Sequence, residues 1–405
     1  MQVELLKRGL PQGVEPVSEE TMVVNIGPQH PATHGVLRVV LELDGETVIK
    51  AIPVVGYLHT GIEKTMESKT YSQVIPLTDR MDYVANLSNN LGYCLAVEKL
   101  SDIEVPPKAQ FVRVLLTELT RIASHLIWIG THPHDIGVAT IFLYAFRERE
   151  TLLDLFELVS GQRMMTSYFR IGGLAKDIPE GFNSMVENVL KTFPQRIDDY
   201  ESLLTRNRIW LMRTKGVGII SKEDAIDYCL SGPMSRGSGL KWDLRKSNPY
   251  SSYDKFEFDI PTGENGDVFD RYMVRVKEMR QSLRIVKQAF EGMPEGDFVA
   301  RVPGVTLPPK EEVFESMEAL IFHFKTIVDG FSPPKGEVYH SIESPKGEIG
   351  FYIVSDGTNK PYRVKVRPPC FVNLSALNRL VSGRLLADVI ATIGSIDFVL
   401  GEIDR

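Results

Sequence analysis

The feature that most constrains the fold is a run of apolar residues that recurs at steps of three and four positions. This spacing places the residues on one face of an α-helix, and a face this apolar is buried. The run consists of Phe111, Leu115, Leu119, Ile122, Leu126 and Ile129. We expect the helix to end near Gly130, because Pro133 follows it. The run therefore predicts a core of long helices.

Further helical patterns and two β patterns flank this run. We expect helices over residues 137–159, 182–212, 266–291, 311–326 and 375–392. The dipeptide Asp44-Gly45 separates VLRVVLEL from ETVIKAIPVV, and such a dipeptide between β-branched runs is typical of a β-hairpin. Alternation and turn residues predict a small sheet within residues 336–369.

Together the patterns predict an α+β fold that is mainly α. It has a long-helix bundle core, an N-terminal β-hairpin region and a small C-terminal β region. The chain has 405 residues, of which 43% are hydrophobic, so it can bury a sizeable core. We divide it into an N-terminal arm (1–20), an N-terminal β region with a histidine loop (21–63), a helical-bundle core (64–330) and a C-terminal β region (331–405). The final GSIDFVLGEIDR is half apolar, so we expect a docked tail.

Composition excludes several classes of protein. The formal net charge of −7 gives no basic excess for binding nucleic acid or anionic lipid. The three cysteines form no C-x-x-C pair, so neither a disulfide framework nor a local zinc or iron–sulfur site is indicated. No signal peptide opens the chain, and residues 122–134, which carry no acidic side chain, Lys or Arg, hold three histidines and a proline. We therefore expect membrane association only through a partner.

The segment GPQHPATHGVLR holds His30 and His34 on a loop that its prolines and glycines restrict. The two histidines are open to three interpretations: bonding to their own backbone, a metal pair, or donation of a proton to a ligand. The i,i+4 spacing gives little support to a metal pair, because it creates a shared face only on a helix. An imidazole titrates near neutral pH, so it can exchange a proton with a ligand.

Two other segments carry side chains that can donate protons or hold charge. TDRMDYV contains Arg80 and Tyr83, which form either a charged surface turn with the ring on the core or a fixed cation beside a phenol donor. THPHDIGVAT contains Asp135, which is either the N-cap of the next helix or a carboxylate that orients a histidine.

These segments and others resemble one family over nearly the whole chain, from about Val23 to Arg405. The motifs that carry the resemblance include GPQHPATHGVLR, DRMDYV, LTRIASHLIWIG, GQRMMTSYFRIGG, DVFDRYMVRVKEMRQS, PKGEIGFYIVSDG and GSIDFVLGEIDR. They resemble the 49-kDa subunit (the D subunit) of proton-pumping NADH:quinone oxidoreductase, respiratory complex I. The resemblance implies a subunit that forms the quinone headgroup site and passes electrons to quinone, coupled to proton translocation.

The resemblance also implies the molecular surroundings. Quinone is the substrate, the chain has no cofactor of its own, and a 4Fe-4S cluster lies adjacent in a partner subunit, with NADH and FMN elsewhere in the complex. The implied partners are the cluster-bearing B subunit, the C and I subunits and the membrane-embedded H subunit, without nucleic acid. The implied location is peripheral, on the cytoplasmic side of the bacterial inner membrane or the equivalent face of an organelle membrane.

The family is similar to the large subunit of nickel–iron hydrogenases, which hold their metal with a Cys-x-x-Cys near each end. The matching stretches RMDYVA and DFVLGE place Asp82, Ala85, Val399 and Glu402 at the cysteine positions. Soft metal sites need thiolates, so we expect no metal here and a quinone in the former metal cavity. Two alternatives are a membrane-bound hydrogenase, which the missing cysteines disfavour, and a non-catalytic scaffold subunit.

Three catalytic residues follow from the resemblance. His34 and Tyr83 resemble the pair that hydrogen-bonds the two sides of the headgroup, and Asp135 resembles the carboxylate behind that histidine. Reduction of quinone takes two electrons and two protons, which a phenol and an imidazolium can supply. Their loss leaves the charge of Asp135 without a partner, which is costly in a buried site. The hypothesis is that Asp135 then responds, as the first step of coupling.

Three more residues are expected near the headgroup or the cluster. Arg80 resembles the arginine that lies against the terminal cluster, and His30 belongs to the same loop as His34. Met165 stands in GQRMMTSYFRIGG where many members of the family have a histidine. Methionine cannot titrate, so we expect the cluster potential to lack the pH dependence that such a histidine would give.

Overall fold

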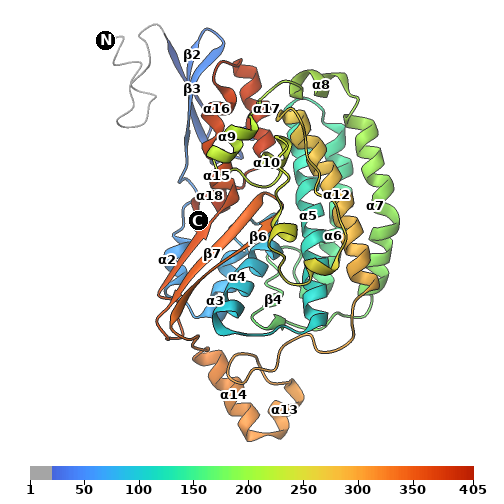
Figure 1. Ribbon diagram of the computed structural model, residues 1–405, viewed down its shortest axis with the longest axis vertical. Coiled ribbons are helices and arrows are strands. Elements are labelled where there is room, and N and C mark those ends of the chain that lie inside the picture. The colour runs from blue at the N-terminus through green and yellow to red at the C-terminus, as the bar shows by residue number, and fades with distance from the viewer. Residues whose placement is uncertain (1–20) are drawn as a thin grey trace.

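The computed structural model describes residues 21–405, so the arm expected over residues 1–20 lies outside the described part. Four long helices form the core: α5 (Pro107–Asp135), α6 (Thr140–Ser160), α7 (Phe182–Leu204) and α12 (Val268–Glu291). Helix α5 packs against α6 and α12, and α7 packs on the outer side of both (Figure 1). The apolar run of α5 is buried along its whole length. The prediction of a mainly α fold with a long-helix core is confirmed.

The expected end of the central helix near Gly130 is wrong, because α5 continues to Asp135. Pro133 lies inside this last turn, and its carbonyl oxygen accepts hydrogen bonds from the N–H groups of Ile136 and Val138, at 3.1 and 2.8 Å. These bonds close the helix after the proline and stop it there. Helix α6 begins at Thr140 with Ala139 as its N-cap. The N-cap interpretation of Asp135 is therefore wrong.

Three other expected helices are each divided in two. Residues 182–212 form α7 and α8 (Arg208–Thr214), because the Asn207 side chain accepts hydrogen bonds from the N–H groups of Ile209 and Trp210 and starts a new helix. Residues 311–326 form α13 (Lys310–Glu315) and α14 (Met317–Val328), and the Ser316 side chain caps the second. Residues 375–392 fall into α16 (Leu377–Val381) and α17 (Leu386–Ile396).

Shorter helices surround the core. They are α2 (Ile62–Met66), α3 (Tyr71–Thr78), α4 (Asn86–Ser101), α9 (Lys222–Asp227), α10 (Pro233–Gly237), α11 (Leu244–Ser247), α15 (Pro369–Ser375) and α18 (Leu400–Asp404), with short 3₁₀ turns η1 (Pro31–Thr33) and η2 (Tyr253–Lys255). In Figure 1, α15 and α18 lie between the N-terminal strands and the C-terminal sheet. Leu400 and Ile403 are each 1% exposed, which confirms the docked tail.

Two three-stranded antiparallel sheets flank the helices. The first has the order β1 (Met22–Ile26), β2 (Arg38–Asp44) and β3 (Thr47–Val54), and the predicted β2–β3 hairpin is present. Its two turn residues are Gly45 and Glu46, one position later than predicted, because Asp44 still pairs with Thr47 as the last residue of β2. The second has the order β6 (Gly336–Ser344), β7 (Gly347–Ser355) and β8 (Arg363–Arg367), and packs on α4. A two-stranded ribbon of β4 (Phe169–Arg170) and β5 (Gly173–Leu174) completes the strands of the described residues.

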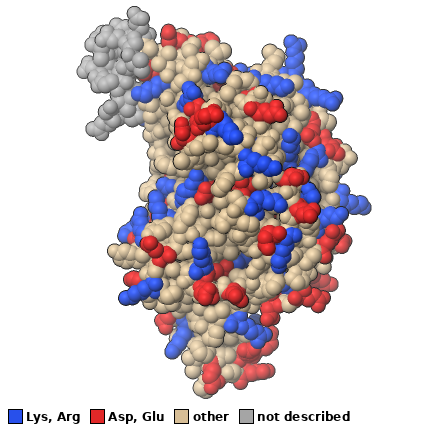
Figure 2. Space-filling view, viewed as in Figure 1, with Lys and Arg blue, Asp and Glu red and all other residues tan. Residues whose placement is uncertain are grey.

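Charges of both signs are interspersed over the face shown in Figure 2, in keeping with the small net charge. Among residues 21–405, none of the helices combines the length and the apolar character that crossing a bilayer requires. In Figure 1, α18 lies below β2 and β3, next to α15.

Candidate functional site

Two segments that lie at opposite ends of the chain pack directly against each other. A Cβ atom on Gly401 would lie 2.6 Å from the carbonyl oxygen of Met81, 2.9 Å from that of Arg80 and 3.5 Å from the Tyr83 ring. Only glycine permits this approach, so the glycine of DFVLGE brings the tail onto the turn of DRMDYV. These are the two stretches that the hydrogenase resemblance aligned with a shared site, and the fold brings them together.

The histidine loop folds into the short 3₁₀ turn η1, and the two histidines take different roles in it. His30 is the N-cap, and its Nδ1 accepts a hydrogen bond from the N–H of Ala32 at 3.2 Å. His34 ends the turn in the left-handed conformation, with φ 54°. Its ring lies 4.7 Å from the ring of Phe398, in the tail. Backbone bonding therefore accounts for His30, whereas His34 is directed to the tail.

The protonation state of His34 follows from its surroundings. Its side chain is exposed to solvent on one side, while protein atoms crowd it closely enough that desolvation lowers its pKa from 6.5. A backbone hydrogen bond at Phe398 raises this pKa, and the positive charge of Lys346 lowers it further. The net direction is downward, so His34 is neutral at pH 7 in this chain. That differs from the protonated histidine that direct proton donation would need.

Tyr83 is half-buried and keeps its proton at neutral pH. Burial raises its pKa above 10, the negative charge of Asp82 raises it further, and Lys346 acts in the opposite sense. The phenol is therefore a hydrogen-bond donor in the resting state. Tyr83 lies against Gly401 and His34 against Phe398, so both side chains border the same tail segment.

Asp135 ends α5 on the side of the histidine loop. Burial raises its pKa, and the nearby His134 and His30 lower it. These electrostatic neighbours link Asp135 to the His30 end of the loop. The placement of Asp135 directly behind His34 stays a prediction. A buried histidine of the same helix turn, His132, donates a hydrogen bond from Nε2 to the carbonyl oxygen of Ala391 at 2.9 Å.

Arg80 and Met165 belong to segments that are tied together. The Asp79 carboxylate accepts hydrogen bonds from the N–H of Ser167, at 3.1 Å, and from its hydroxyl, at 2.5 Å. Arg80 is exposed and donates to the carbonyl oxygen of Pro76 at 2.6 Å. Met165 is half-buried, in the left-handed conformation with φ 56°. These contacts place an exposed guanidinium and a thioether on one corner of the site.

Beneath the tail lies a buried basic residue to which sequence reasoning gave no role. Lys346 is 2% exposed, sits in the turn between β6 and β7, and its Nζ lies 3.5 Å from Oδ2 of Asp82. It also donates to the hydroxyl of Ser124. The charges of Asp82, Asp397 and Glu402 all raise its pKa against the opposing effect of burial. The motif PKGEIG contains this lysine, but no local pattern indicates what it faces.

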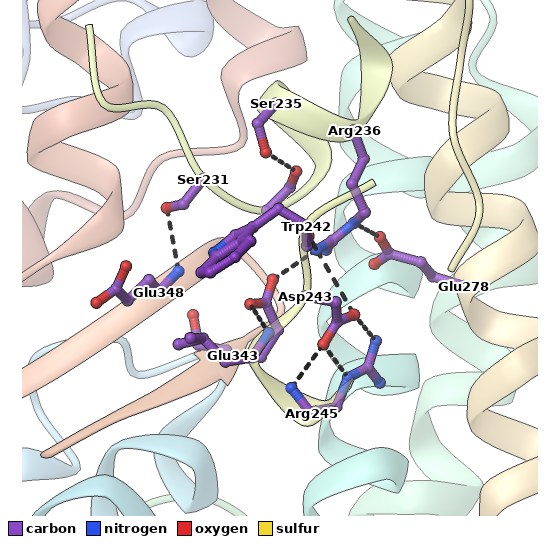
Figure 3. Close-up of polar contacts among 12 residues, drawn as sticks. Ser231, Ser235, Arg236, Trp242, Asp243, Arg245, Glu278, Glu343 and Glu348 are labelled. Atoms are coloured by element: carbon purple, nitrogen blue, oxygen red, sulfur yellow. Dashed lines mark hydrogen bonds and ion pairs between the residues drawn. The ribbon is translucent and has the colours of Figure 1, made fainter. Parts of the chain in front are cut away.

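A second buried network fixes the turn that carries Lys346. Arg236 donates to Glu278 at 2.8 Å and to Glu343, on β6, at 2.7 Å, as Figure 3 shows. Arg121, on α5, donates to the carbonyl oxygens of Glu343 and Ser344, at 2.6 and 2.9 Å. Because these bonds hold the end of β6 to the helical core, they also hold Lys346 in position. Asp243 and Arg245 extend the network deeper into the core (Figure 3).

The aligned cysteine positions do not form a hydrogenase-type metal site. Asp82 and Glu402 lie close enough for each to act on the other's charge, but Ala85 and Val399 have no donor atoms. Within residues 21–405, no group of three or more His, Cys, Asp or Glu is arranged to hold a metal ion.

The helical core and the junction of both chain ends are accompanied by a clear match to one protein family. The family described as "Respiratory-chain NADH dehydrogenase, 49 Kd subunit" matches residues 135–405, and the chain belongs to this family. It is 62% identical over 384 residues to the D 1 subunit of the NADH-quinone oxidoreductase of Solibacter usitatus, covering 95% of this chain and 94% of that one. It is 59% identical over 388 residues to the D subunit of the NADH-quinone oxidoreductase of Geotalea uraniireducens, covering 96% of this chain and 100% of the other.

A relative from a third organism gives the same result. The chain is 59% identical over 389 residues to the D 2 subunit of the NADH-quinone oxidoreductase of Chloroflexus aurantiacus, covering 95% of each chain. The resemblance drawn from the motifs is thereby confirmed at the level of the family.

Proposed function

We propose that this chain is the subunit of a proton-translocating NADH:quinone oxidoreductase that binds the quinone headgroup. The headgroup binds where the histidine loop, the turn of residues 80–83 and the tail of residues 397–402 meet. One observation carries the proposal: His34 and Tyr83, from separate segments, both border this tail, at Phe398 and Gly401. Two hydrogen-bonding side chains that border the same short segment suit a ligand with two carbonyl oxygens.

The chemistry of the site matches the needs of quinone reduction. Quinone, two electrons and two protons give quinol. Tyr83 donates its phenol proton to one oxygen once reduction has made that oxygen strongly basic. At the other oxygen, the developing negative charge stabilises an imidazolium, so the neutral and solvent-exposed His34 takes up a proton from water and delivers it to that oxygen. Asp135, whose pKa is raised by burial and lowered in part by the nearby His30 of the same loop as His34, responds to this change of charge.

Electrons reach the quinone from a partner subunit. The corner formed by Arg80 and Met165 is the side that faces the 4Fe-4S cluster of the partner B subunit. The exposed guanidinium supplies a fixed positive charge there, which stabilises added electrons on a neighbour. We assign the C, I and H subunits as further partners and a peripheral position on the cytoplasmic side of the membrane. NADH and FMN act elsewhere in the complex.

The test is quinone reductase activity of the assembled complex with Tyr83→Phe or His34→Ala, with reduction of the iron–sulfur cluster followed in the same samples. Matched controls are Tyr144→Phe and His323→Ala, which change the same residue types outside the histidine loop, the turn of residues 80–83 and the tail. We expect the cluster to be reduced normally while quinone turnover falls by about two orders of magnitude or more in both site variants. Unchanged turnover in both would make this chain a scaffold around another subunit's chemistry.

A further inference from the structure

A buried cluster of three carboxylates and two cations lies between the tail and the rest of the core. Asp82, Asp397 and Glu402 supply the carboxylates, and Lys346 and Arg275 the cations; none is more than 9% exposed. The cations divide between two of the acids. Lys346 pairs with Asp82 at 3.5 Å, and Arg275 Nε lies 3.6 Å from Oδ2 of Asp397. One carboxylate is therefore left over.

That carboxylate is Glu402, which has no accessible surface and makes no ion pair with any residue from 21 to 405. Its Oε2 accepts a hydrogen bond from the N–H of Cys370 at 3.2 Å, and its Oε1 has no hydrogen-bond partner within the described chain. A buried charge with one hydrogen bond and no counter-ion is unfavourable, so the neutral carboxylic acid is the stable form.

The surroundings of Glu402 shift its pKa in the direction that its burial and its lack of a counter-ion predict. Burial raises the pKa of Glu402 to about 8, and the negative charge of Asp82 raises it as well. The Cys370 thiol and backbone and the more distant Lys346 lower it by less. These groups come from the turn after α3, from α15 and from the β6–β7 turn. Glu402 therefore holds a proton below about pH 8 and loses it above.

Other buried acids of the core show that burial alone does not give this result. Glu118 is as deeply buried, but Arg121 and Arg245 lower its pKa to about 2. Glu278 is paired with Arg236 and His125, which also lower its pKa. Glu118 and Glu278 each contact cations, whereas Glu402 does not.

We propose that Glu402 is the proton reserve that reloads Tyr83 after the tyrosine has protonated the reduced quinone to form the quinol. This deepens the proposed function and rests on it. Asp82 joins the two groups, because it directly precedes Tyr83 in the chain and its charge acts on both Tyr83 and Glu402. Glu402 does not contact the quinone in this scheme. It acts through Tyr83, by supplying the proton that Tyr83 has given up.

The transfer balances in two steps. First, the O–H bond of the Glu402 carboxylic acid breaks and the proton passes to the Asp82 carboxylate. Second, the proton leaves Asp82 and forms the O–H bond of Tyr83, whose phenolate accepts it. Asp82 returns to its starting state, and the net change is neutral Glu402 plus tyrosinate giving the Glu402 carboxylate plus tyrosine. Lys346 stays next to Asp82 during both steps. Its positive charge stabilises the negative charge, whether that charge is on Tyr83, Asp82 or Glu402.

The experiment is infrared redox-difference spectroscopy of the assembled, membrane-bound complex, combined with the pH profile of quinone turnover. The variants are Glu402→Gln and the conservative Glu402→Asp. The control is Asp404→Asn on the same helix, because the Asp404 carboxylate binds the N–H groups of Gly56 and Leu58 and not the cluster.

In the wild type and the control we expect the carbonyl band of a carboxylic acid, shifted in D₂O, to decrease during quinone turnover, and turnover to fall above about pH 8. Glu402→Gln loses the band and the alkaline fall, and its turnover at neutral pH drops several-fold. Glu402→Asp retains both with an altered midpoint, and it serves as the deciding variant if the Gln protein fails to assemble.

Persistence of both the band and the alkaline fall in Glu402→Gln, or an unshifted midpoint in Glu402→Asp, overturns the inference. The proposed function is judged separately, by Tyr83→Phe and His34→Ala. If those variants lose turnover while the Glu402 variants behave as the wild type, the headgroup site stands and the proton reserve does not.

Discussion

Lys346 and Asp82 form a buried ion pair, with Nζ 3.5 Å from Oδ2, between the C-terminal sheet and the turn that precedes α4. Both side chains are essentially inaccessible to solvent. The pair joins the turn of DRMDYV to the strand hairpin of PKGEIG, so it holds together parts of the site that are distant in sequence. Its role is to fix the turn from which Tyr83 projects.

Removal of one member of this ion pair leaves the other as an unpaired buried charge, which destabilises the folded chain. We predict that Lys346→Met destabilises the folded chain by about 3–5 kcal/mol, because it leaves a buried carboxylate without its cation. Thermal release of the chain from the assembled complex measures the loss. The double variant Lys346→Met/Asp82→Asn recovers part of it. The exposed Lys325→Met is the control, and equal stability of single and double variants would contradict a coupled pair.

Acid stability depends on buried histidines that stay neutral in the fold. Burial lowers the pKa of His125 to about 4 and that of His132 to about 3. The unfolded chain binds these protons at about pH 6.5 and the folded chain does not, so stability is fully present above pH 6.5 and declines as the pH falls below it. The expected slope is about 1.4 kcal/mol per pH unit for each histidine.

The variant His132→Asn tests this dependence. Melting temperature measured between about pH 6.5 and 4.5, before most carboxylates titrate, declines less steeply in the variant than in the wild type. His323→Asn, on the exposed helix α14, keeps the wild-type slope. A variant slope as steep as that of the wild type would show that His132 is charged in the folded protein.

The close approach at Gly401 predicts a strong effect of a single methyl group. In Gly401→Ala the new Cβ would lie 2.6 Å from the carbonyl oxygen of Met81, so tail and turn must separate. We expect a destabilisation of about 1–3 kcal/mol and a loss of quinone turnover that exceeds the loss of assembled complex. Gly130→Ala, whose Cβ would meet the Phe146 ring at 3.3 Å, is the control. Turnover in proportion to assembly for both variants would count against a site at this junction.

Met165 allows a test of the side that faces the cluster. In the wild type we expect the midpoint potential of the partner's cluster to be independent of pH, because a thioether does not titrate. In Met165→His the potential falls with rising pH across the titration of the imidazole, at about pH 6.5. Redox titration of the assembled complex followed by electron paramagnetic resonance measures both. A sloping wild-type potential would contradict the assignment.

The sequence predicted correctly those helices and strands that depend on residues close to one another in the chain. The β2–β3 hairpin and the buried face of α5 depend on neighbours within a few residues, and both are present, although the turn lies one residue later than predicted, at Gly45 and Glu46. The end of α5 was misjudged, because hydrogen bonds to the carbonyl of Pro133 close one more turn after the proline. Asn207 and Ser316 each cap the start of a new helix. Both residues lie inside apolar runs whose periodicity alone predicts one continuous helix.

The candidate site was predictable only in part. The motifs that resemble the family pointed to His34, Tyr83 and Asp135, but no pattern in the sequence places Lys346 against Asp82 or leaves Glu402 without a cation. Those relationships arise from tertiary contacts among four separate segments. The neutral state of His34 likewise depends on Lys346 and on the crowding around the tail.

The central claim is that the quinone headgroup lies against the tail between His34 and Tyr83. Photoaffinity labelling of the assembled complex, with a short-chain benzoquinone that carries a photoreactive group on its ring, tests this claim most directly. The account predicts that labelled peptides come from residues 27–38, 80–85 and 397–402, and that excess unmodified quinone suppresses the labelling. Labels that are suppressed by quinone but lie wholly outside these segments would contradict it.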